Sequence, residues 1–182
     1  MRRMLIALVG ALLGVVLLAP QAAAVPAQKP FCGITWGSLD IEAGRSMGGS
    51  LVNLRSGRHA CYDRLVVDVR GTIGHYSAGY VPVVRADGSG EPVKVDGGAA
   101  LQVFVFAPNW DRNDTITYDP ANARRAVDVG GYRTFRQVSY LGAFEGDSHI
   151  AIGVRARLPY RVFVLDGPGD LSRLVIDVAH RW

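Results

Sequence analysis

The amino-acid sequence predicts an all-β fold: a β-sandwich of short antiparallel strands with Gly/Pro turns, preceded by a signal peptide and an irregular N-terminal arm. Three observations favour this class. Apolar residues alternate with a period of two, Gly- and Pro-rich breakers recur at short intervals, and helical patterns are scarce after residue 25. Short strands separated by such turns are typical of sandwiches and barrels.

The first 24 residues have the layout of a secretory signal peptide. A positive start with Arg2 and Arg3 precedes an apolar run at 4–19, and Ala22-Ala23-Ala24 offers the small residues of a cleavage site. The apolar run is shorter than the about 20 residues that a membrane anchor needs. We therefore expect cleavage after Ala24, a secreted or cell-wall-associated protein, and no stable membrane insertion.

The charge of the expected mature chain excludes one class of partner. Without Arg2 and Arg3, the 20 basic side chains fall to 18 against 16 acidic ones, a net charge of about +2. The arginines are spread along the chain, whereas a nucleic-acid-binding protein concentrates them in a patch. We expect no nucleic-acid partner.

Cys32 and Cys61 are the two cysteines of the chain. In an oxidising compartment an even number favours one intramolecular disulfide. A redox pair is usually spaced C-x-x-C and a structural zinc ion takes four ligands, and neither pattern is present. We predict a Cys32–Cys61 bridge that ties an irregular arm, residues 25–56, to a β-domain at 57–182.

The elements follow in order along the chain. Pro residues near position 25 and Gly48-Gly49-Ser50 predict that the linker and arm have no regular structure. At most one or two helical turns are expected, at 121–126. Strands are predicted at 65–69, 80–85, 101–106, 133–140, 149–155, 161–165 and 174–178.

One internal repeat accompanies these strands. The phrase RLVVDV at 64–69 returns as RLVIDV at 173–178. Coincidence between two Val-rich strands is one interpretation. The other is that the two segments are equivalent strands in the halves of a pseudo-symmetric sandwich, with Leu and Val/Ile facing inward and Asp facing outward.

Four segments resemble the AMIN-like domain of secreted actinobacterial proteins. They are HACYDRLVVDVRG (59–71), GYVPVVRADGSGEPVKVDGGAALQV (79–103), YLGAFEGDSHIAIGV (140–154) and PYRVFVLDGPGDLSRLVIDVAH (159–180). The resemblance implies a β-sandwich related to the AMIN domain of cell-wall amidases and secretins, which is implicated in peptidoglycan binding. It implies a non-catalytic recognition module at the cell envelope, with peptidoglycan or another wall glycan as partner.

Two alternatives stay open at this point. One is a secreted protein-protein interaction module that docks on an envelope partner, and the other is an unrecognised hydrolase. Asp147-Ser148-His149 groups three side chains capable of catalysis, but neighbours on a strand point to opposite faces and a triad assembles from distant residues. The oxygen-rich segment 111–119 lacks the Gly and Glu of a calcium-binding loop. We predict no enzymatic activity and no catalytic, metal or cofactor site.

Aromatic residues supply the ligand-binding candidate. Aromatic rings stack on sugar faces in glycan-binding sandwiches, and arginines pair with hydroxyls and carboxylates. Tyr160 and Arg161, at the start of a predicted strand after Pro159, are selected as candidate ligand contacts. The alternative for Tyr160 is that it seals the end of the sandwich.

Overall fold

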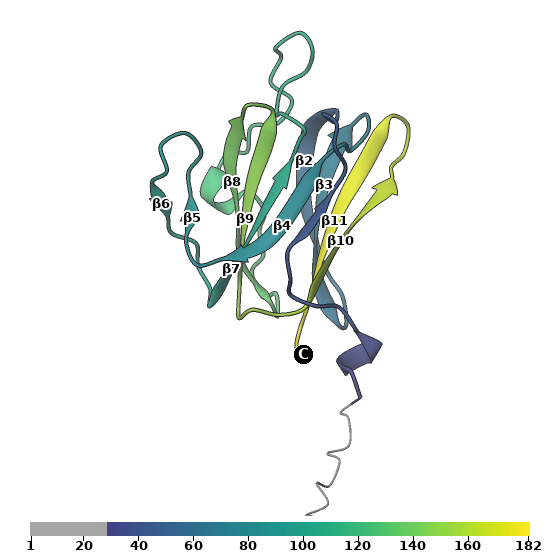
Figure 1. Cartoon of the computed structure of the whole chain (residues 1–182), viewed down its shortest axis with the longest axis vertical. Coiled ribbons are helices and arrows are strands. Elements are labelled where there is room, and N and C mark those ends of the chain that lie inside the picture. Colours follow the sequence, from purple (N-terminus) through teal and green to yellow (C-terminus); the bar gives the residue numbers. More distant parts are fainter. Residues whose placement is uncertain (1–28) are drawn as a thin grey trace, which may run out of the picture.

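A computed structural model describes residues 29–182, so the predicted signal peptide at 1–24 lies outside the described residues. Two antiparallel sheets pack face to face, and a small hairpin projects beside them (Figure 1). The all-β sandwich predicted from the sequence is confirmed. Within residues 29–182, no helix is long and apolar enough to cross a membrane.

The larger sheet has five strands. Their spatial order is β1 (Ile41–Ala43), β4 (Tyr76–Val81), β7 (Ala99–Val105), β9 (Asp147–Val154) and β8 (Phe135–Phe144). The hairpin of β5 (Val84–Arg85) and β6 (Pro92–Val93) follows β4. The strand predicted at 80–85 is instead divided, because Pro82, which cannot donate to a ladder, comes directly after the last residue of β4 and β5 begins at Val84.

The smaller sheet has four strands. Their order is β10 (Tyr160–Asp166), β11 (Leu171–Ala179), β3 (Tyr62–Arg70) and β2 (Ser50–Arg58). Two short 3-10 turns, η1 (Phe31–Gly33) and η2 (Ala123–Arg125), are the helical elements of the described chain. The second falls inside the one or two helical turns expected at 121–126.

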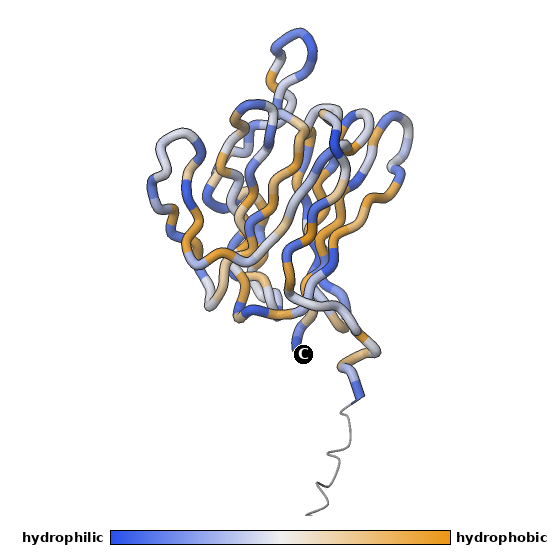
Figure 2. The backbone as a smooth tube through the Cα atoms, in the orientation of Figure 1, coloured by the Kyte–Doolittle hydropathy of each residue, from blue (hydrophilic) through white to orange (hydrophobic). Residues whose placement is uncertain are grey.

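The hydrophobic core lies between the two sheets and follows the period of two. Alternate residues of each central strand are fully buried in one cluster, among them Leu65, Val67, Leu101, Val103 and Ile152. Figure 2 shows the same division, with apolar stretches along the strands and hydrophilic residues in many of the turns. The strand around Leu65 was therefore predictable from alternation, whereas the one around Leu101 was predicted from a continuous apolar run and buries alternate residues.

The repeated phrase occupies neighbouring strands of one sheet. β3 and β11 pair antiparallel, so that Arg64 lies opposite Asp177 and Arg173 lies opposite Asp68. Leu and Val/Ile of both copies face the core, as predicted. The two copies are thus related by a local two-fold axis within the four-stranded sheet rather than placed in separate sheets.

The predicted disulfide is present and joins Cys32 to Cys61, with the two Cα atoms 6.2 Å apart. The expectation of an irregular arm up to residue 56 is wrong at Ile41–Ala43, which forms β1, and from Ser50 onward, where the nine-residue strand β2 begins. A bulge between Leu51 and Asn53 shifts the register with β3 and breaks the alternation that reveals a strand.

Gly48 and Gly49 are required by a close backbone approach rather than by flexibility. The Gly48 amide donates to the Phe106 carbonyl at 2.7 Å, and the Gly49 amide donates to the Thr72 carbonyl at 2.8 Å. A Cβ at Gly49 would lie 1.7 Å from the Arg70 carbonyl oxygen. The arm is therefore packed against the domain at this point.

Candidate functional site

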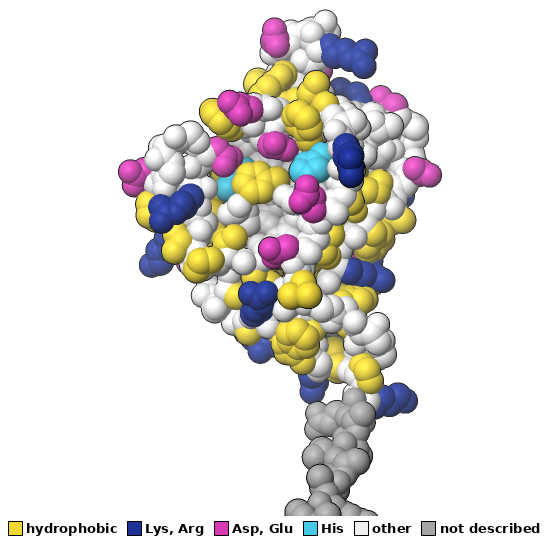
Figure 3. Space-filling model, viewed as in Figure 1, with side chains coloured by type: hydrophobic (Ala, Val, Ile, Leu, Met, Phe, Trp, Pro, Cys, Tyr) yellow, Lys and Arg dark blue, Asp and Glu magenta, His cyan; other side chains and the backbone are white. Residues whose placement is uncertain are grey.

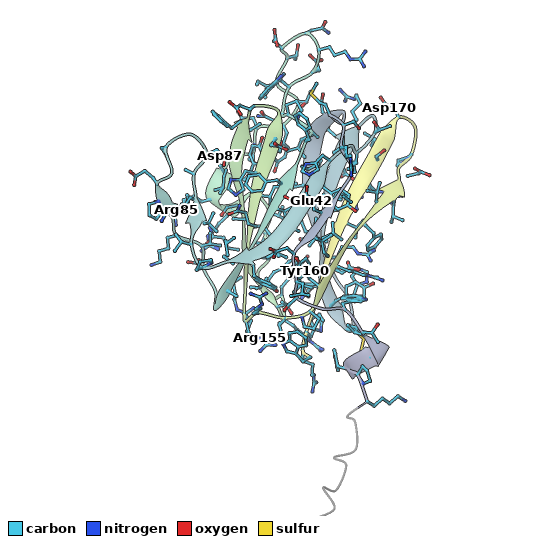
Figure 4. The ribbon with its side chains drawn as sticks, in the orientation of Figure 1. Glu42, Arg85, Asp87, Arg155, Tyr160 and Asp170 are labelled. Atoms are coloured by element: carbon cyan, nitrogen blue, oxygen red, sulfur yellow. A yellow bond between two sulfur atoms is a disulfide. The ribbon has the colours of Figure 1, made fainter. Side chains whose placement is uncertain are left out.

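Tyr160 and Arg161 lie on opposite faces of β10, because successive side chains of a strand alternate. Tyr160 is 2% exposed, and its hydroxyl lies within hydrogen-bond distance of the carbonyls of Leu39 and Ala78, at 2.7 and 2.8 Å, so that its single O–H donates to one or is shared between them. Burial raises the pKa of Tyr160 to about 12. Tyr160 lies between the arm and β4 (Figure 4) and contacts both through its hydroxyl, so its ring is not on the surface and Arg161 is left as the candidate contact.

Arg161 is held on the outer face of the four-stranded sheet by a buried carboxylate. Its Nε atom donates to Asp177 Oδ2 at 2.9 Å, and its Nη2 atom forms an ion pair with the same oxygen at 2.8 Å. Arg64, on the other side of Asp177, donates from Nε to Oδ1 at 2.6 Å and from Nη2 to Oδ2 at 2.9 Å. Hydrogen bonding to Asp177 raises the pKa of Arg64 above its usual value. One fully buried carboxylate thus orients two guanidinium groups and neutralises one of them.

Aromatic rings surround these two arginines. The Arg161 guanidinium carbon lies 4.3 Å from the ring centre of Trp36 and 4.8 Å from that of Phe163. The Arg64 guanidinium carbon lies 5.3 Å from the ring centre of Tyr62. All three rings are half-buried. We call Trp36, Tyr62, Arg64, Arg161 and Phe163 the aromatic–arginine cluster.

The arm contributes to this cluster through its path along the edge of the sheet. The amide of Tyr160, at the start of edge strand β10, donates to the Gly37 carbonyl at 2.8 Å, directly after Trp36. The disulfide fixes the arm four residues before Trp36. The arm is therefore one wall of the candidate site and not only a tether.

A hollow of about 250 Å³ lies next to the cluster on the same outer face. We call it the arginine pocket. The side chains of Val66, Leu165 and Val175 supply its apolar surface. Its polar lining includes Arg55, Arg64, Arg173 and His59.

A larger hollow, of about 420 Å³, lies at the end of the five-stranded sheet. Its lining includes Tyr80, Arg157 and the backbone of Gly97 and Gly98. The Arg157 guanidinium lies over the Tyr80 ring at 5.2 Å and donates to the Ser38 carbonyl at 2.7 Å. This hollow has a single charged side chain in its lining, so it offers less to an anionic ligand than the arginine pocket.

The outer face of the five-stranded sheet has the opposite charge character. Figure 3 shows acidic side chains gathered around histidines on the face toward the viewer. Two of these contacts are Glu42 with His75 at 3.1 Å and Asp87 with His149 at 3.0 Å. An anionic polymer would meet repulsion here and attraction on the other sheet.

The run Asp147-Ser148-His149 divides between the two faces of β9, as expected. The Ser148 hydroxyl points inward and donates to the Ala107 carbonyl at 2.7 Å. His149 points outward, stacks on Phe104 with ring centres 4.2 Å apart, and its pKa is lowered by burial. Ser148 and His149 therefore do not form a nucleophile–base pair.

The oxygen-rich segment at 111–119 forms a turn. Asp111 Oδ1 accepts the backbone N–H groups of Asn113 at 2.8 Å and Thr115 at 3.1 Å, and these bonds lower the pKa of Asp111. Within residues 29–182 there is no group of three His, Cys, Asp or Glu side chains arranged to hold a metal ion.

Sequence reasoning missed most of the aromatic–arginine cluster. Trp36 lies 125 residues before Arg161 in the chain, and no local pattern links the two. A usable signal for Arg64 and Asp177 was the repeated phrase, because antiparallel pairing of its two copies places the Arg of one opposite the Asp of the other.

Residues 49–180, well over half of the chain, match the AMIN-like domain. The chain belongs to the AMIN-like domain family. No curated protein matches it. AMIN-like domains are in general non-catalytic binding domains associated with the cell envelope, and the match indicates no catalytic family. The matched segment starts inside what was expected to be the arm, in agreement with β2, and contains every member of the aromatic–arginine cluster except Trp36.

Proposed function

We propose that this AMIN-like protein is an exported, non-catalytic recognition module that binds peptidoglycan through the outer face of its four-stranded sheet. The observation that carries the proposal is the pair of guanidinium groups that buried Asp177 fixes among three aromatic rings. Side chains that are already ordered lose little conformational entropy when a ligand binds.

The chemistry of this face suits a wall polymer. Half-buried rings can stack on sugar faces, and guanidinium groups pair with carboxylates in two parallel hydrogen bonds. Asp177 occupies Nε and Nη2 of both arginines, and the described residues supply no hydrogen-bond partner for Nη1 of Arg64 or Arg161. Each arginine thus keeps N–H groups for a ligand while its position is fixed.

A second candidate function is docking on an envelope protein through the edge strand β10. Val164 and Leu165, near the end of this strand, are exposed apolar residues. An exposed strand edge can pair with an extended segment of another chain. The family match favours wall binding. Docking on an envelope protein is the next function to test if the protein does not bind cell walls.

Co-sedimentation with insoluble sacculi at low and at high salt tests the proposal. Stacking and paired hydrogen bonds should survive about 0.5 M salt, whereas attraction by a net charge of about +2 should fade as the Debye length shrinks below 10 Å. Arg161→Ala should bind about tenfold more weakly, the equivalent of about 1.4 kcal/mol. The matched control is Arg112→Ala, which removes an exposed arginine of the 111–115 turn and should bind as the wild type does. Binding no greater than that of an unrelated secreted protein, or equal loss in both variants, contradicts the proposal.

A further inference from the structure

The arginine pocket sits on the local two-fold axis that relates the two copies of the repeated phrase. Val66 of β3 and Val175 of β11 lie directly opposite each other in the register and both line the pocket. Both are buried, although they belong to the outer face of the sheet. The long side chains around them therefore form the walls of a hollow whose floor is apolar.

The ion pairs around this axis are not symmetric. Arg64 is paired with Asp177, the residue opposite it. The equivalent pair would be Arg173 with Asp68, but Asp68 is taken by Arg55, with two bonds of 2.8 and 3.0 Å. Among the described residues, Arg173 has no carboxylate within 4.0 Å and donates instead from Nη2 to the Asp166 carbonyl.

Arg173 also has a buried donor that nothing satisfies. Its Nε atom is buried and has no hydrogen-bond partner among the described residues. A buried N–H of a charged group without an acceptor is costly, and such a group marks a position where an acceptor is missing. Three guanidinium groups and no carboxylate side chain line this pocket, so the missing acceptor is an anion.

The size and floor of the pocket define the anion further. A volume of about 250 Å³ is below the about 300–1,000 Å³ of pockets for drug-sized ligands. It fits the end of a chain better than a disaccharide. Planar guanidinium groups match a carboxylate in two-point pairing, and Val66, Val175 and Leu165 offer contact to an aliphatic group beside it.

We propose that the arginine pocket binds the free carboxylate end of a wall peptide whose terminal side chain is small and aliphatic. The inference rests on the proposed function, since the wall is the source of that peptide. The aromatic–arginine cluster lies beside the pocket and shares Arg64 with it. Sugar stacking and carboxylate capture are thus neighbouring parts of one binding face.

Titration of the purified protein with N-acetyl-D-Ala-D-Ala, and with the same peptide as its C-terminal amide, tests the inference. The acid should bind at least tenfold more tightly than the amide, since only the acid carries the carboxylate. Arg173→Gln should lower the affinity for the acid about tenfold, and Arg112→Gln should leave it unchanged. Inorganic phosphate, titrated alone, should bind more weakly than the acid because it makes no use of the apolar floor.

Gly57→Val provides a variant that keeps every guanidinium. Gly57 lies in β2 and lines the pocket, and a Cβ there would make an ordinary contact of 3.6 Å with His59 Nε2. Valine suits a strand, so this variant should fold and fill the hollow. It should lose binding of the acid. Binding of the acid equal to wild type in Gly57→Val, equal binding of acid and amide, or tighter binding of phosphate each overturns the inference.

The sacculi assay separates this inference from the proposed function. Arg161-dependent binding of sacculi without any binding of the acid overturns the pocket inference and leaves the proposed function standing. Binding of the acid without binding of sacculi supports the pocket as a carboxylate-binding site and overturns the proposed function.

Discussion

Replacing Asp177 by alanine should destabilise the fold more than any other single change on the outer face of the four-stranded sheet. Asp177 is fully buried, accepts three hydrogen bonds from Arg64 and Arg161, and has a further ion-pair contact with Nη2 of Arg161. Without it, two positive charges remain on the sheet with no carboxylate between them. Removing one partner of a buried ion pair costs about 3–5 kcal/mol.

The expected value is lower here because the arginines are partly in contact with water. The Arg64 side chain is 22% exposed and the Arg161 side chain is 41% exposed, so Arg161 can turn into solvent. We expect Asp177→Ala to reduce the free energy of unfolding by about 2–3 kcal/mol. The matched control is Asp68→Ala, whose main partner, Arg55, is 48% exposed and should cost about 1 kcal/mol.

Urea unfolding of the wild type and both variants measures these differences. The slope of free energy against urea should stay constant, because the surface exposed on unfolding is unchanged. A loss below about 1 kcal/mol in Asp177→Ala, or a loss no larger than in Asp68→Ala, would refute the role of Asp177 as the residue that orders the two arginines.

Three further predictions concern other parts of the fold. Tyr160→Phe should lower the free energy of unfolding by about 1–2 kcal/mol, because it removes the hydroxyl that contacts two backbone carbonyls. Binding of sacculi should be unchanged, and weaker binding by the folded variant would show that Tyr160 belongs to the binding site. Reducing the Cys32–Cys61 disulfide, whose cysteines are 29 residues apart, should lower the free energy of unfolding by about 3–4 kcal/mol, and a loss below about 1 kcal/mol in urea titration would contradict that loop-closure estimate. Burial lowers the pKa of His149 in the folded state, so the unfolded chain binds the proton more readily. The free energy of unfolding should therefore fall as the pH drops below about 6.5. His149→Asn should weaken this pH dependence, and an unchanged dependence in the variant would show that other groups cause it.

The strands of the core were predictable because their pattern is local. Alternation in 65–69 and 174–178 depends only on neighbours in the sequence, and both segments became central strands with the expected residues inside. β2 escaped notice because the bulge after Leu51 interrupts the same pattern. A one-residue irregularity shifts the side chains that follow it to the other face, so the alternation that identifies a strand is lost even in a strand of nine residues.

The candidate site was harder to predict because it depends on long-range pairing. Tyr160 and Arg161 were chosen together, yet a strand turns neighbouring side chains to opposite faces, and only the packing shows that Tyr160 faces inward. Trp36 reaches Arg161 through the path of the arm. Neither fact follows from the residues near positions 160 and 161.

The most direct test of the wall-binding face is to map the contact residue by residue. Amide chemical-shift changes in the ¹⁵N-labelled protein can be followed during titration with soluble muropeptides from digested sacculi. Shifts should concentrate in β10, β11, β3 and β2 and in the arm around Trp36, and in Arg161→Ala they should reach half of their maximum only at about tenfold higher muropeptide concentration. Shifts confined to the five-stranded sheet or to the hollow beside Tyr80, or no shifts at all, would contradict the assignment of the outer face of the four-stranded sheet as the wall-binding surface.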